Sequence, residues 1–443
     1  MAKRRFRNIS RRELLIVVVP AVLLVVAAFW LAAQFVKPAP PKSVVMSTGA
    51  PHGAYEMYAA NYKVILARNG VELVERPSAG AVENLQRLAD PNEQVDIAFV
   101  QGGLGVGVTK DGLVSLGSFY YEPVWVFYRG RDAIDRLAQL KGKRVAIGAE
   151  GSGTRKLALD LLVASGVDAA NTKFLADGGL AAVAALQNGA ADAIFLVGPA
   201  RSAAVWSALY GPGFRLMNFA QADAYVRQFP FLAKLALPEG AIDVARSIPP
   251  ANTALVAPMT TMVARESLHP ALVDLLLSAG AEVHGGPGVF QRSGEFPNAT
   301  QVDFPLSEEA SRHFRSGTRF LHRYLPFWLA TLIERTLVLL VPLVAVLIPV
   351  MRIVPGIYGW RMRSRIYRHY GELGALEREI ADAPGGAEAP EWLKRLDAIE
   401  SEVEHIRTPL AFANQLYILR EHIGLVRAAI LKKAAERATV SSP

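Results

Sequence analysis

Two long apolar segments flank a central region in which hydrophobic residues occur only in short runs. Residues 14–36 carry no charge, and the segment 327–351 is uncharged from Thr336 to Met351. At about 1.5 Å per helical residue, each segment is long enough to cross a hydrocarbon core about 30 Å thick. The pattern predicts a transmembrane anchor at 14–36 and a second transmembrane helix at 327–351. The respective alternatives are a cleaved signal peptide and the buried helix of a soluble domain.

Basic residues lie on the outer side of both apolar segments. Before the first stand Lys3, Arg4, Arg5, Arg7, Arg11 and Arg12. After the second come Arg352, Arg361, Arg363, Arg365 and Arg368. Flanks rich in Lys and Arg stay in the cytoplasm. We therefore expect a protein of the bacterial inner (cytoplasmic) membrane, with both termini cytoplasmic. Its basic N-terminus would be 1–13, its cytoplasmic tail 352–443, and its domain at 43–325 would be periplasmic or extracellular.

Inside the central region, strand-like runs alternate with amphipathic stretches, and the order repeats. Residues 44–100 predict strands at 44–47, 71–76 and 95–100, with helices at 54–68 and 81–89 between them. Residues 144–197 predict strands at 144–147, 173–175 and 193–197, with helices at 154–164 and 180–187. Two βαβαβ units indicate an α/β fold with parallel sheets and right-handed crossovers. Two lobes of similar build follow.

The loops of the two units correspond in place and in spacing. Gly49 and Gly148 follow the first strands, Gly80 and Gly179 follow the second strands, and each pair is 99 residues apart. Open α/β sheets bind ligands at the carboxyl ends of their strands. Helix N-termini there offer unpaired N–H groups, and glycine lets a ligand approach the backbone. Two such edges facing each other predict a cleft for a small anion such as a carboxylate.

The residues expected around the ligand lie in these loops. They are Thr48, Gly49, His52, Gly53, Tyr55, Gly80, Gln101, Ser152, Gly153, Thr154 and Gly179. Arg155 either faces the anion or is a solvated residue of the first helical turn that pairs with an acid. His52 either contributes to the site or serves only as a turn residue.

Two extended segments link the lobes. Residues 113–128 are extended and aromatic and take the chain from the first lobe to the second, and 252–263 has strand character and can return it. Two crossing segments make a hinge about which lobes can close. Lobe 1 is therefore expected at 43–125 and 252–325, and lobe 2 at 126–251.

Charge and motif content exclude several classes of function. The net charge is +8, but residues 43–325 carry 25 basic and 26 acidic side chains, so no groove for nucleic acid is predicted. The chain has no cysteine, its eight histidines show no metal-ligand spacing, and the loop 148–154 lacks the Gly-Lys-Ser/Thr ending of a phosphate loop. No nucleophile–base pair is recognisable. We expect no catalytic residue, no bound metal and no cofactor.

At this point the loop segments resemble a known family. STGAPHGAY at 47–55, GAVENL at 80–85, DIAFVQ at 96–101 and GAEGSGT at 148–154 are similar to the TAXI-type solute receptors of TRAP transporters, over about residues 43–290. The resemblance implies a two-lobed domain like that of periplasmic binding proteins (a Venus flytrap), which hands a small organic acid to a membrane permease. It also implies that Tyr121 and Glu122 line the cleft. The usual member is secreted and ends after its second lobe, so the membrane segments and the tail are additions.

The tail shows three apolar stripes at helical spacing. They are Ile366–Tyr370–Leu373–Leu376–Ile380, Leu393–Leu396–Ile399–Val403–Ile406 and Phe412–Leu416–Leu419–Ile423–Val426–Ile430, with a break at 384–390 between the first two. Amphipathic helices must bury such stripes on one another or on a partner. The sequence predicts a helical hairpin, or a homo-oligomer formed through the tail.

Together these features predict a membrane-tethered extracytoplasmic receptor that binds a small, carboxylate-bearing organic solute by lobe closure, for TRAP-type transport. Its partners would be the solute, a permease and the lipid bilayer. A transmembrane ligand sensor that signals through the cytoplasmic helices is the main alternative. An enzyme on the same fold and an envelope protein with a vestigial cleft also stay open.

Overall fold

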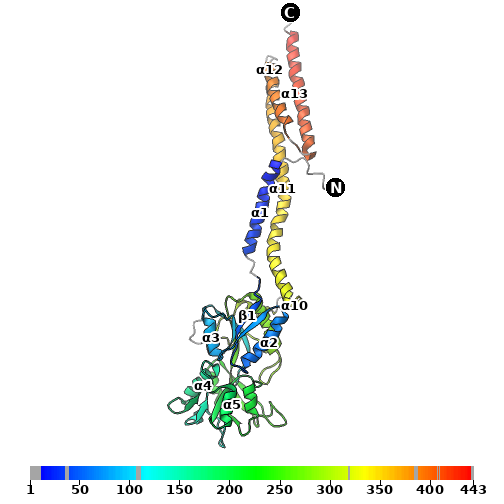
Figure 1. The fold of residues 1–443 in the computed structure, drawn as a ribbon. Coiled ribbons are helices and arrows are strands. Elements are labelled where there is room, and N and C mark those ends of the chain that lie inside the picture. Colours follow the sequence, from blue (N-terminus) through cyan, green and yellow to red (C-terminus); the bar gives the residue numbers. More distant parts are fainter. Residues whose placement is uncertain are drawn as a thin grey trace. The chain divides into compact units, whose positions relative to one another are not determined.

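The computed structural model describes residues 11–34, 39–105, 111–317, 320–383, 388–406, 408 and 410–440 (Figure 1). These residues form two compact units, one made of the described residues up to 332 that follow residue 37, and one made of 11–34 together with those from 333 onward. Residues 1–10, 35–38 and 384–387 lie outside the described residues. Most of the expected basic N-terminus, the end of the first apolar segment and the start of the break in the tail therefore fall there.

Lobe 1 is built on a mixed sheet with the strand order β10-β11-β3-β1-β2, and β4 also pairs with β11. Along β3, Ile97 and Phe99 belong to one apolar cluster and Ala98 and Val100 to another, because successive side chains point to opposite faces. Helices α2 and α8 cover the first face, and α3 covers the second. The elements of this lobe are β1 (Ser43–Ser47), α2 (Ala54–Arg68), β2 (Glu72–Arg76), α3 (Ala81–Ala89), β3 (Ile97–Gln101), β4 (Leu113–Tyr121), β11 (Thr253–Arg265), α8 (Pro270–His284), α9 (Glu308–Ser316) and α10 (Phe320–Tyr324).

Lobe 2 has its own sheet, with the order β7-β6-β8-β5-β9. Its core is larger and includes Trp125 and Phe127 of β5, which are both almost fully buried. The elements are β5 (Val124–Tyr128), η1 (Leu137–Leu140), β6 (Arg144–Ala146), α4 (Gly153–Ala164), β7 (Lys173–Leu175), α5 (Gly179–Gln187), β8 (Ala193–Val197), α6 (Ala203–Leu209), β9 (Arg215–Leu216), α7 (Ala222–Gln228) and β10 (Leu232–Leu237). The side chains of β10 join this core although its backbone pairs with β11.

The parallel pairing expected within each βαβαβ unit is confirmed, but each complete sheet is mixed. Each βαβαβ unit does give a parallel trio, β2-β1-β3 in lobe 1 and β7-β6-β8 in lobe 2. A linking strand then adds antiparallel to the outer strand of each trio, β11 beside β3 and β5 beside β8. The local pattern could not show this, because the added strands come from distant parts of the chain.

The segment expected to be extended over 113–128 consists of two strands. β4 ends at Tyr121 and β5 begins at Val124, with Glu122 and Pro123 between them. Proline lacks the N–H that a continuous ladder needs. The return segment is one strand, β11, of 13 residues. At the crossing point the Glu122 N–H donates to the Pro258 carbonyl at 2.9 Å, so the two connections are bonded to each other.

The helices of the repeated units lie close to the expected bounds. α2 and α3 begin and end at the expected residues, and α4 and α5 each begin one residue earlier, at Gly153 and Gly179. The Ser152 hydroxyl accepts a hydrogen bond from the Arg155 N–H at 3.2 Å, which fixes the start of α4 at the residue after Ser152.

The other unit consists of helices. They are α1 (Arg11–Gln34), α11 (Phe327–Asp382), α12 (Ala389–Glu404), η3 (Leu410–Phe412) and α13 (Ala413–Val440). The expected second apolar segment and the first tail helix are one continuous helix of 56 residues, which contains Pro342, Pro349 and Pro355 without ending at any of them. The helix therefore continues past residue 351, where the second apolar segment was expected to end.

The three apolar stripes of the tail pack on one another. This is the first of the two expected outcomes, in which the tail helices bury their stripes within one chain. Their buried core contains Ile366, Leu373, Leu376, Ile380, Trp392, Leu396, Val403, Leu419, Ile423, Val426 and Ile430. Charged pairs edge this core: Arg395 contacts Glu379 at 2.8 Å, and Arg427 lies 2.5 Å from both Asp397 and Glu400.

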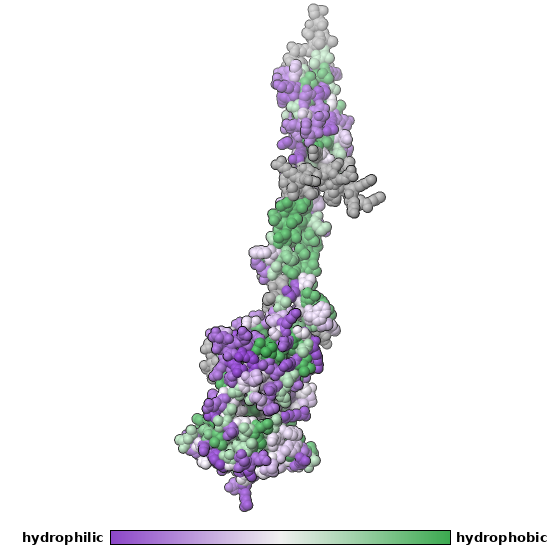
Figure 2. Space-filling view, viewed as in Figure 1, coloured by the Kyte–Doolittle hydropathy of each residue, from purple (hydrophilic) through white to green (hydrophobic). Residues whose placement is uncertain are grey.

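Among the described residues, α11 is the one helix that is long and apolar enough to cross a membrane. None of its most apolar window is buried. The described apolar part of α1, Val18–Gln34, is a shorter helix of 17 residues. Pro20, Ala21 and Leu24 of α1 line a groove together with Ala345, Pro349 and other residues of α11, so the two apolar helices are neighbours. Figure 2 shows hydrophobic residues gathered over these two helices.

Candidate functional site

Loops from both lobes surround one cavity of about 530 Å³. The loops after β1 and β2 contribute from lobe 1, and the loops after β6 and β7 from lobe 2, with the start of α6 beside them. The residues expected at the site that do line it are Gly49, His52, Gly53, Tyr55, Gly80, Gln101, Glu122, Ser152, Gly153, Thr154 and Gly179. The structure thus brings together loops that are far apart in sequence. Whether these residues bind a ligand stays a prediction.

Five helices, α2 to α6, begin at this cavity, and all of them except α4 lack a side-chain cap. The residues before α2, α3 and α5 are Gly53, Gly80 and Gly178, none of which makes a side-chain hydrogen bond to its helix. The first N–H groups of a helix have no acceptor within the helix, and the helix dipole adds partial positive charge there. An anionic group in the cavity would supply the missing acceptors. α4 differs, since Ser152 already caps it.

Two carboxylates hold the loops of lobe 1 in place. Glu56 accepts a hydrogen bond from the His52 N–H at 2.5 Å, and Glu83 accepts one from the Ala79 N–H at 2.6 Å. His52 is held at a φ of 63°, a left-handed conformation that an ordinary side chain rarely adopts. The turn before α2 is therefore fixed by hydrogen bonds of its own rather than by a ligand.

Gln101 contributes an unsatisfied donor. It ends β3, its side chain is almost fully buried, and its amide nitrogen has no hydrogen-bond partner among the described residues. A buried amide that lacks a partner costs free energy. A ligand that accepts a hydrogen bond would remove this cost, so Gln101 favours an acceptor in the cavity.

Glu122 places an acidic group in the same cavity. The side chain is 4% exposed, and Tyr55 donates its hydroxyl to Glu122 Oε2 at 3.3 Å. Burial raises the pKa of Glu122 to about 7, and the hydroxyls of Thr260 and Tyr55 partly offset that effect. At neutral pH this carboxyl is therefore divided between its acid form, which donates a hydrogen bond, and its carboxylate.

Three residues expected at the site do not line the cavity. Thr48 is buried beneath its loop, where its hydroxyl donates to the Arg76 carbonyl at 3.4 Å. Tyr121 precedes Glu122, so it points to the opposite side of the strand, and its hydroxyl donates to Glu295 at 2.9 Å. Arg155 donates to the Gly148 carbonyl at 3.3 Å and lies 4.0 Å from Glu150. Both roles expected of Arg155 stay predictions.

Asn84 positions the loops of lobe 1, and the sequence analysis did not single it out. Its side-chain amide donates to the carbonyls of Thr48 (2.6 Å) and Phe99 (2.9 Å). Its oxygen accepts from the hydroxyls of Ser47 (2.7 Å) and Ser78 (2.6 Å). One fully buried side chain therefore ties β1, β3 and the loop after β2 together. A polar residue on the buried face of an amphipathic helix was the signal that could have revealed it.

The lobes touch where α3 and α4 begin, and small residues make this possible. The Glu83 N–H donates to the Gly151 carbonyl at 3.3 Å across the interface. A Cβ on Gly80 would lie 3.3 Å from the Ser152 Cα, and one on Gly151 would lie 3.2 Å from the Ala79 Cβ. Figure 1 shows α3 of lobe 1 directly above α4 of lobe 2. The lobes are thus in contact on this side of the cavity.

Two α/β lobes joined by crossing strands, with a cavity between them, form the architecture of proteins that close on a ligand by hinge motion. Residues 46–314 match the NMT1-like family, and the chain belongs to this family.

Solved structures of similar architecture are distant. The periplasmic aliphatic sulphonate-binding protein SsuA of Escherichia coli is 17% identical, with 55% of this chain and 73% of SsuA covered and a TM-score of 0.37. An ancestral arginine-binding protein bound to arginine is 16% identical, with 55% and 92% covered and a TM-score of 0.35. The alkanesulfonate-binding SsuA of Xanthomonas axonopodis pv. citri, bound to MOPS, is 16% identical, with 56% and 82% covered and a TM-score of 0.32. At these identities none of the named ligands transfers to this chain.

Proposed function

We propose that the protein is a membrane-tethered receptor that captures a small organic anion between its two lobes. The observation that carries this proposal is the convergence of uncapped helix N-termini and the unpaired Gln101 amide on one cavity of about 530 Å³. A carboxylate or a comparable anionic group satisfies such donors. Each hydrogen bond to a charged group is worth about 1.5–3 kcal/mol.

Glu122 adds an acidic group to a cavity that otherwise offers hydrogen-bond donors. The helix N-termini and Gln101 favour an acceptor, whereas the Glu122 carboxylate favours a donor. The solute therefore carries its anionic group toward the helix N-termini and an uncharged or hydrogen-bond-donating part toward Glu122. A solute with negative charge at both ends would meet repulsion at Glu122 above pH 7.

The membrane attachment rests on α11 and α1. α11 is uncharged from Thr336 to Met351, and Arg352, Arg361, Arg363, Arg365 and Arg368 follow this apolar part. By the positive-inside rule the tail lies in the cytoplasm and the two-lobed domain outside. A phosphatase fused after Pro443 should then be inactive in intact cells, and activity of that fusion would reverse the topology.

Delivery to a TRAP-type permease is the function that the resemblance to the TAXI receptors supports. A transmembrane sensor is the second candidate, and α11 is the observation that favours it. This helix begins at Phe327, whose ring is buried in the core of lobe 1, and continues without interruption to Asp382 in the tail. Deletion of the tail separates the two candidates. Loss of solute uptake would favour sensing or assembly through the tail. Unchanged uptake would favour delivery of the solute to a permease by the two-lobed domain without the tail.

The binding proposal is tested by replacing the neutral amide of Gln101 with a negatively charged carboxylate. In Gln101→Glu a carboxylate replaces the amide donor at nearly constant volume, so an anion should bind at least about 10-fold more weakly. The probe is a panel of mono- and dicarboxylates measured by isothermal titration on the full-length protein in detergent. Gln86→Glu, on the exposed side of α3, is the matched control and should bind like the wild type. Equal affinities in the two variants would place the site elsewhere.

A further inference from the structure

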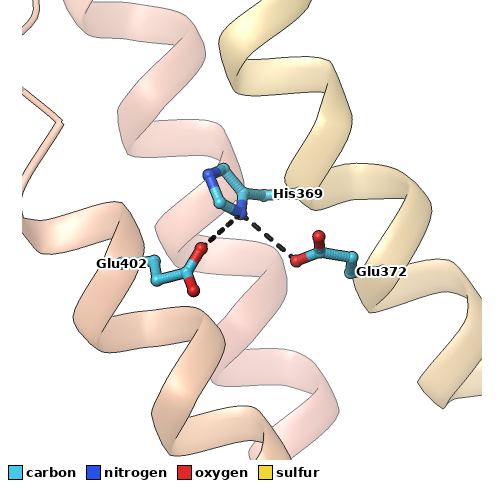
Figure 3. Close-up of side chains that lie close together, drawn as sticks. All are labelled: His369, Glu372 and Glu402. Atoms are coloured by element: carbon cyan, nitrogen blue, oxygen red, sulfur yellow. Dashed lines mark hydrogen bonds and ion pairs between the residues drawn. The ribbon is translucent and has the colours of Figure 1, made fainter.

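A histidine and two glutamates lie together in the helical unit. His369 and Glu372 are on α11 and Glu402 is on α12. Figure 3 shows one ring nitrogen of His369 facing both carboxylates, which approach it from different helices. The Nδ1 atom is 3.4 Å from Glu372 Oε2 and 3.9 Å from Glu402 Oε2. The three potential ligand atoms lie within 4.8 Å of one another.

These separations are long for hydrogen bonds and short enough for a shared ion. An N–H···O bond has its donor and acceptor about 2.9 Å apart. Two ligand atoms that each lie about 2.1 Å from a tetrahedral Zn²⁺ are about 3.4 Å from each other. The distances from His369 Nδ1 therefore leave room for an ion between the three groups.

The surroundings also suit an ion. His369 is 3% exposed and lies on α11 between Ile366 and Leu373, which belong to the apolar core of the tail. The carboxylates of Glu372 and Glu402 are about half exposed and can adjust their position. Among the residues that the structure describes, no Lys or Arg pairs with either carboxylate. The described Lys and Arg side chains therefore leave the two carboxylates beside the imidazole without a permanent cation.

We propose that His369, Glu372 and Glu402 bind a divalent transition-metal ion, such as Zn²⁺, that joins α11 to α12. Nδ1 and one oxygen of each carboxylate are the ligands, and water occupies the remaining position. One nitrogen and two carboxylate oxygens form a ligand set that Zn²⁺ and its neighbours in the first transition series accept. His369 and Glu372 are three residues apart, so they lie on one face of α11 and present both ligands to α12.

The ion would add a second link between these two helices. The first is the chain between Asp382 and Ala389. The ion lies near the other end of α12, close to Glu404, and so holds the helix pair together at the end away from that connection. Metal binding should therefore slow hydrogen exchange at 366–373 and at 399–406.

The test measures metal binding to the full-length protein in detergent after removal of metal with a chelator. Equilibrium dialysis against Zn²⁺ at pH 7.5 should give one bound ion per chain. Glu372→Gln and Glu402→Gln should each weaken binding at least 10-fold. The matched controls are Glu377→Gln on α11 and Glu404→Gln on α12, both exposed and outside the cluster, and they should bind like the wild type.

Cobalt provides a second measurement that does not depend on affinity. Co²⁺ in a four-coordinate N/O site absorbs visible light, and this band should be weakened in Glu402→Gln and unchanged in Glu404→Gln. The proposal is overturned if no ion is retained, or if all four variants bind alike. The three side chains are then only a contact between α11 and α12.

Discussion

At the residue scale, Gly153 marks a position beside the cavity where a side chain would collide with neighbouring atoms. Gly153 is the first residue of α4, and its φ is not positive, so backbone conformation does not demand a glycine here. The constraint is space. A Cβ at this position would overlap the Oε1 atom of Gln101 and lie 3.1 Å from the Ala81 Cβ. Gly153 therefore allows lobe 2 to approach lobe 1.

The first prediction follows from that contact. In Gly153→Ala the new methyl group obstructs lobe closure, so ligand affinity should fall by at least about 10-fold. The variant should fold, because the atom that the new methyl group meets first is the far end of the Gln101 side chain, which can shift. Titration and thermal melts of both proteins measure affinity and folding. An affinity equal to that of the wild type would show that closure does not bring these residues together.

Burial of Glu122 lowers the free energy of unfolding of the two-lobed domain by an amount that depends on pH. Its carboxyl has a pKa of about 7 in the folded protein, against 4.5 for an exposed glutamate. The folded state thus binds more protons than the unfolded state between these values, and the free energy of unfolding falls as the pH rises from about 4.5 to 7. Above pH 7 the cost is constant, at about 3 kcal/mol.

The second prediction is that Glu122→Gln is more stable than the wild type at pH 8, by up to about 3 kcal/mol, and about equally stable at pH 4.5. Urea unfolding at several pH values measures the difference. The comparison between proteins is needed because burial lowers the pKa of His284 to about 3, which destabilises the domain below about pH 6.5 in both. Glu72→Gln, on an exposed side chain of β2, should show no such difference. A constant difference at all pH values would contradict the shifted pKa.

At the scale of elements, α3 connects the sequence to the site. Its bounds are predictable because Gly80 precedes an amphipathic stretch. Its role in the site depends on the four hydrogen bonds of Asn84 to β1, β3 and the loop after β2. Loops that line a cavity keep their shape only while such bonds hold them.

The third prediction concerns this residue. Asn84→Ala removes four hydrogen bonds, to the carbonyls of Thr48 and Phe99 and the hydroxyls of Ser47 and Ser78, so the free energy of unfolding should fall by about 2–4 kcal/mol. Ligand affinity should fall as well, since the loop after β1 loses its support. Chemical unfolding and titration measure both. Asn92→Ala, in the exposed turn after α3, is the control; a similar small effect in both variants would remove Asn84 from the positioning of the loops.

The sequence predicts the elements that local patterns determine. The glycine loops and the βαβαβ repeat indicate which loops lie at the cavity, and the four loops do meet there. The pattern could not show that β11 and β5 add antiparallel, because strand pairing depends on residues distant in the chain. It also could not show which side of the crossover faces the cavity, since Tyr121 and Glu122 are adjacent but point to opposite sides.

At the scale of the whole molecule, the limit of the two-lobed domain lies further along the chain than the sequence suggests. The expected domain ended at 325, but Phe327 is 7% exposed and belongs to the core of lobe 1, and the compact unit extends to Leu332. The first turn of α11 therefore completes this core.

The fourth prediction compares two fragments. A fragment ending at 332 should be more stable than one ending at 325, by about 2 kcal/mol for the buried phenylalanine ring. Within the longer fragment Phe327→Ala should lower the melting temperature, whereas Trp328→Ala, at a neighbouring side chain that is 64% exposed, should leave it nearly unchanged. Thermal melts decide the matter. Equal stability of the two fragments would place the end of the domain at 325.

The strand β11 has a consequence for how the protein is made. Leu255, Val256 and Ala257 at its start belong to the core of lobe 2, and Met262 and Ala264 near its end belong to the core of lobe 1. The core of lobe 2 therefore needs residues that are synthesised after the strands of its own sheet. The core of lobe 1 needs residues of the same strand. Neither core is complete until β11 has left the ribosome. The buried core of lobe 2 is then complete, whereas the core of lobe 1 still needs residues of α8 and Phe327, so lobe 2 can reach its native packing before lobe 1.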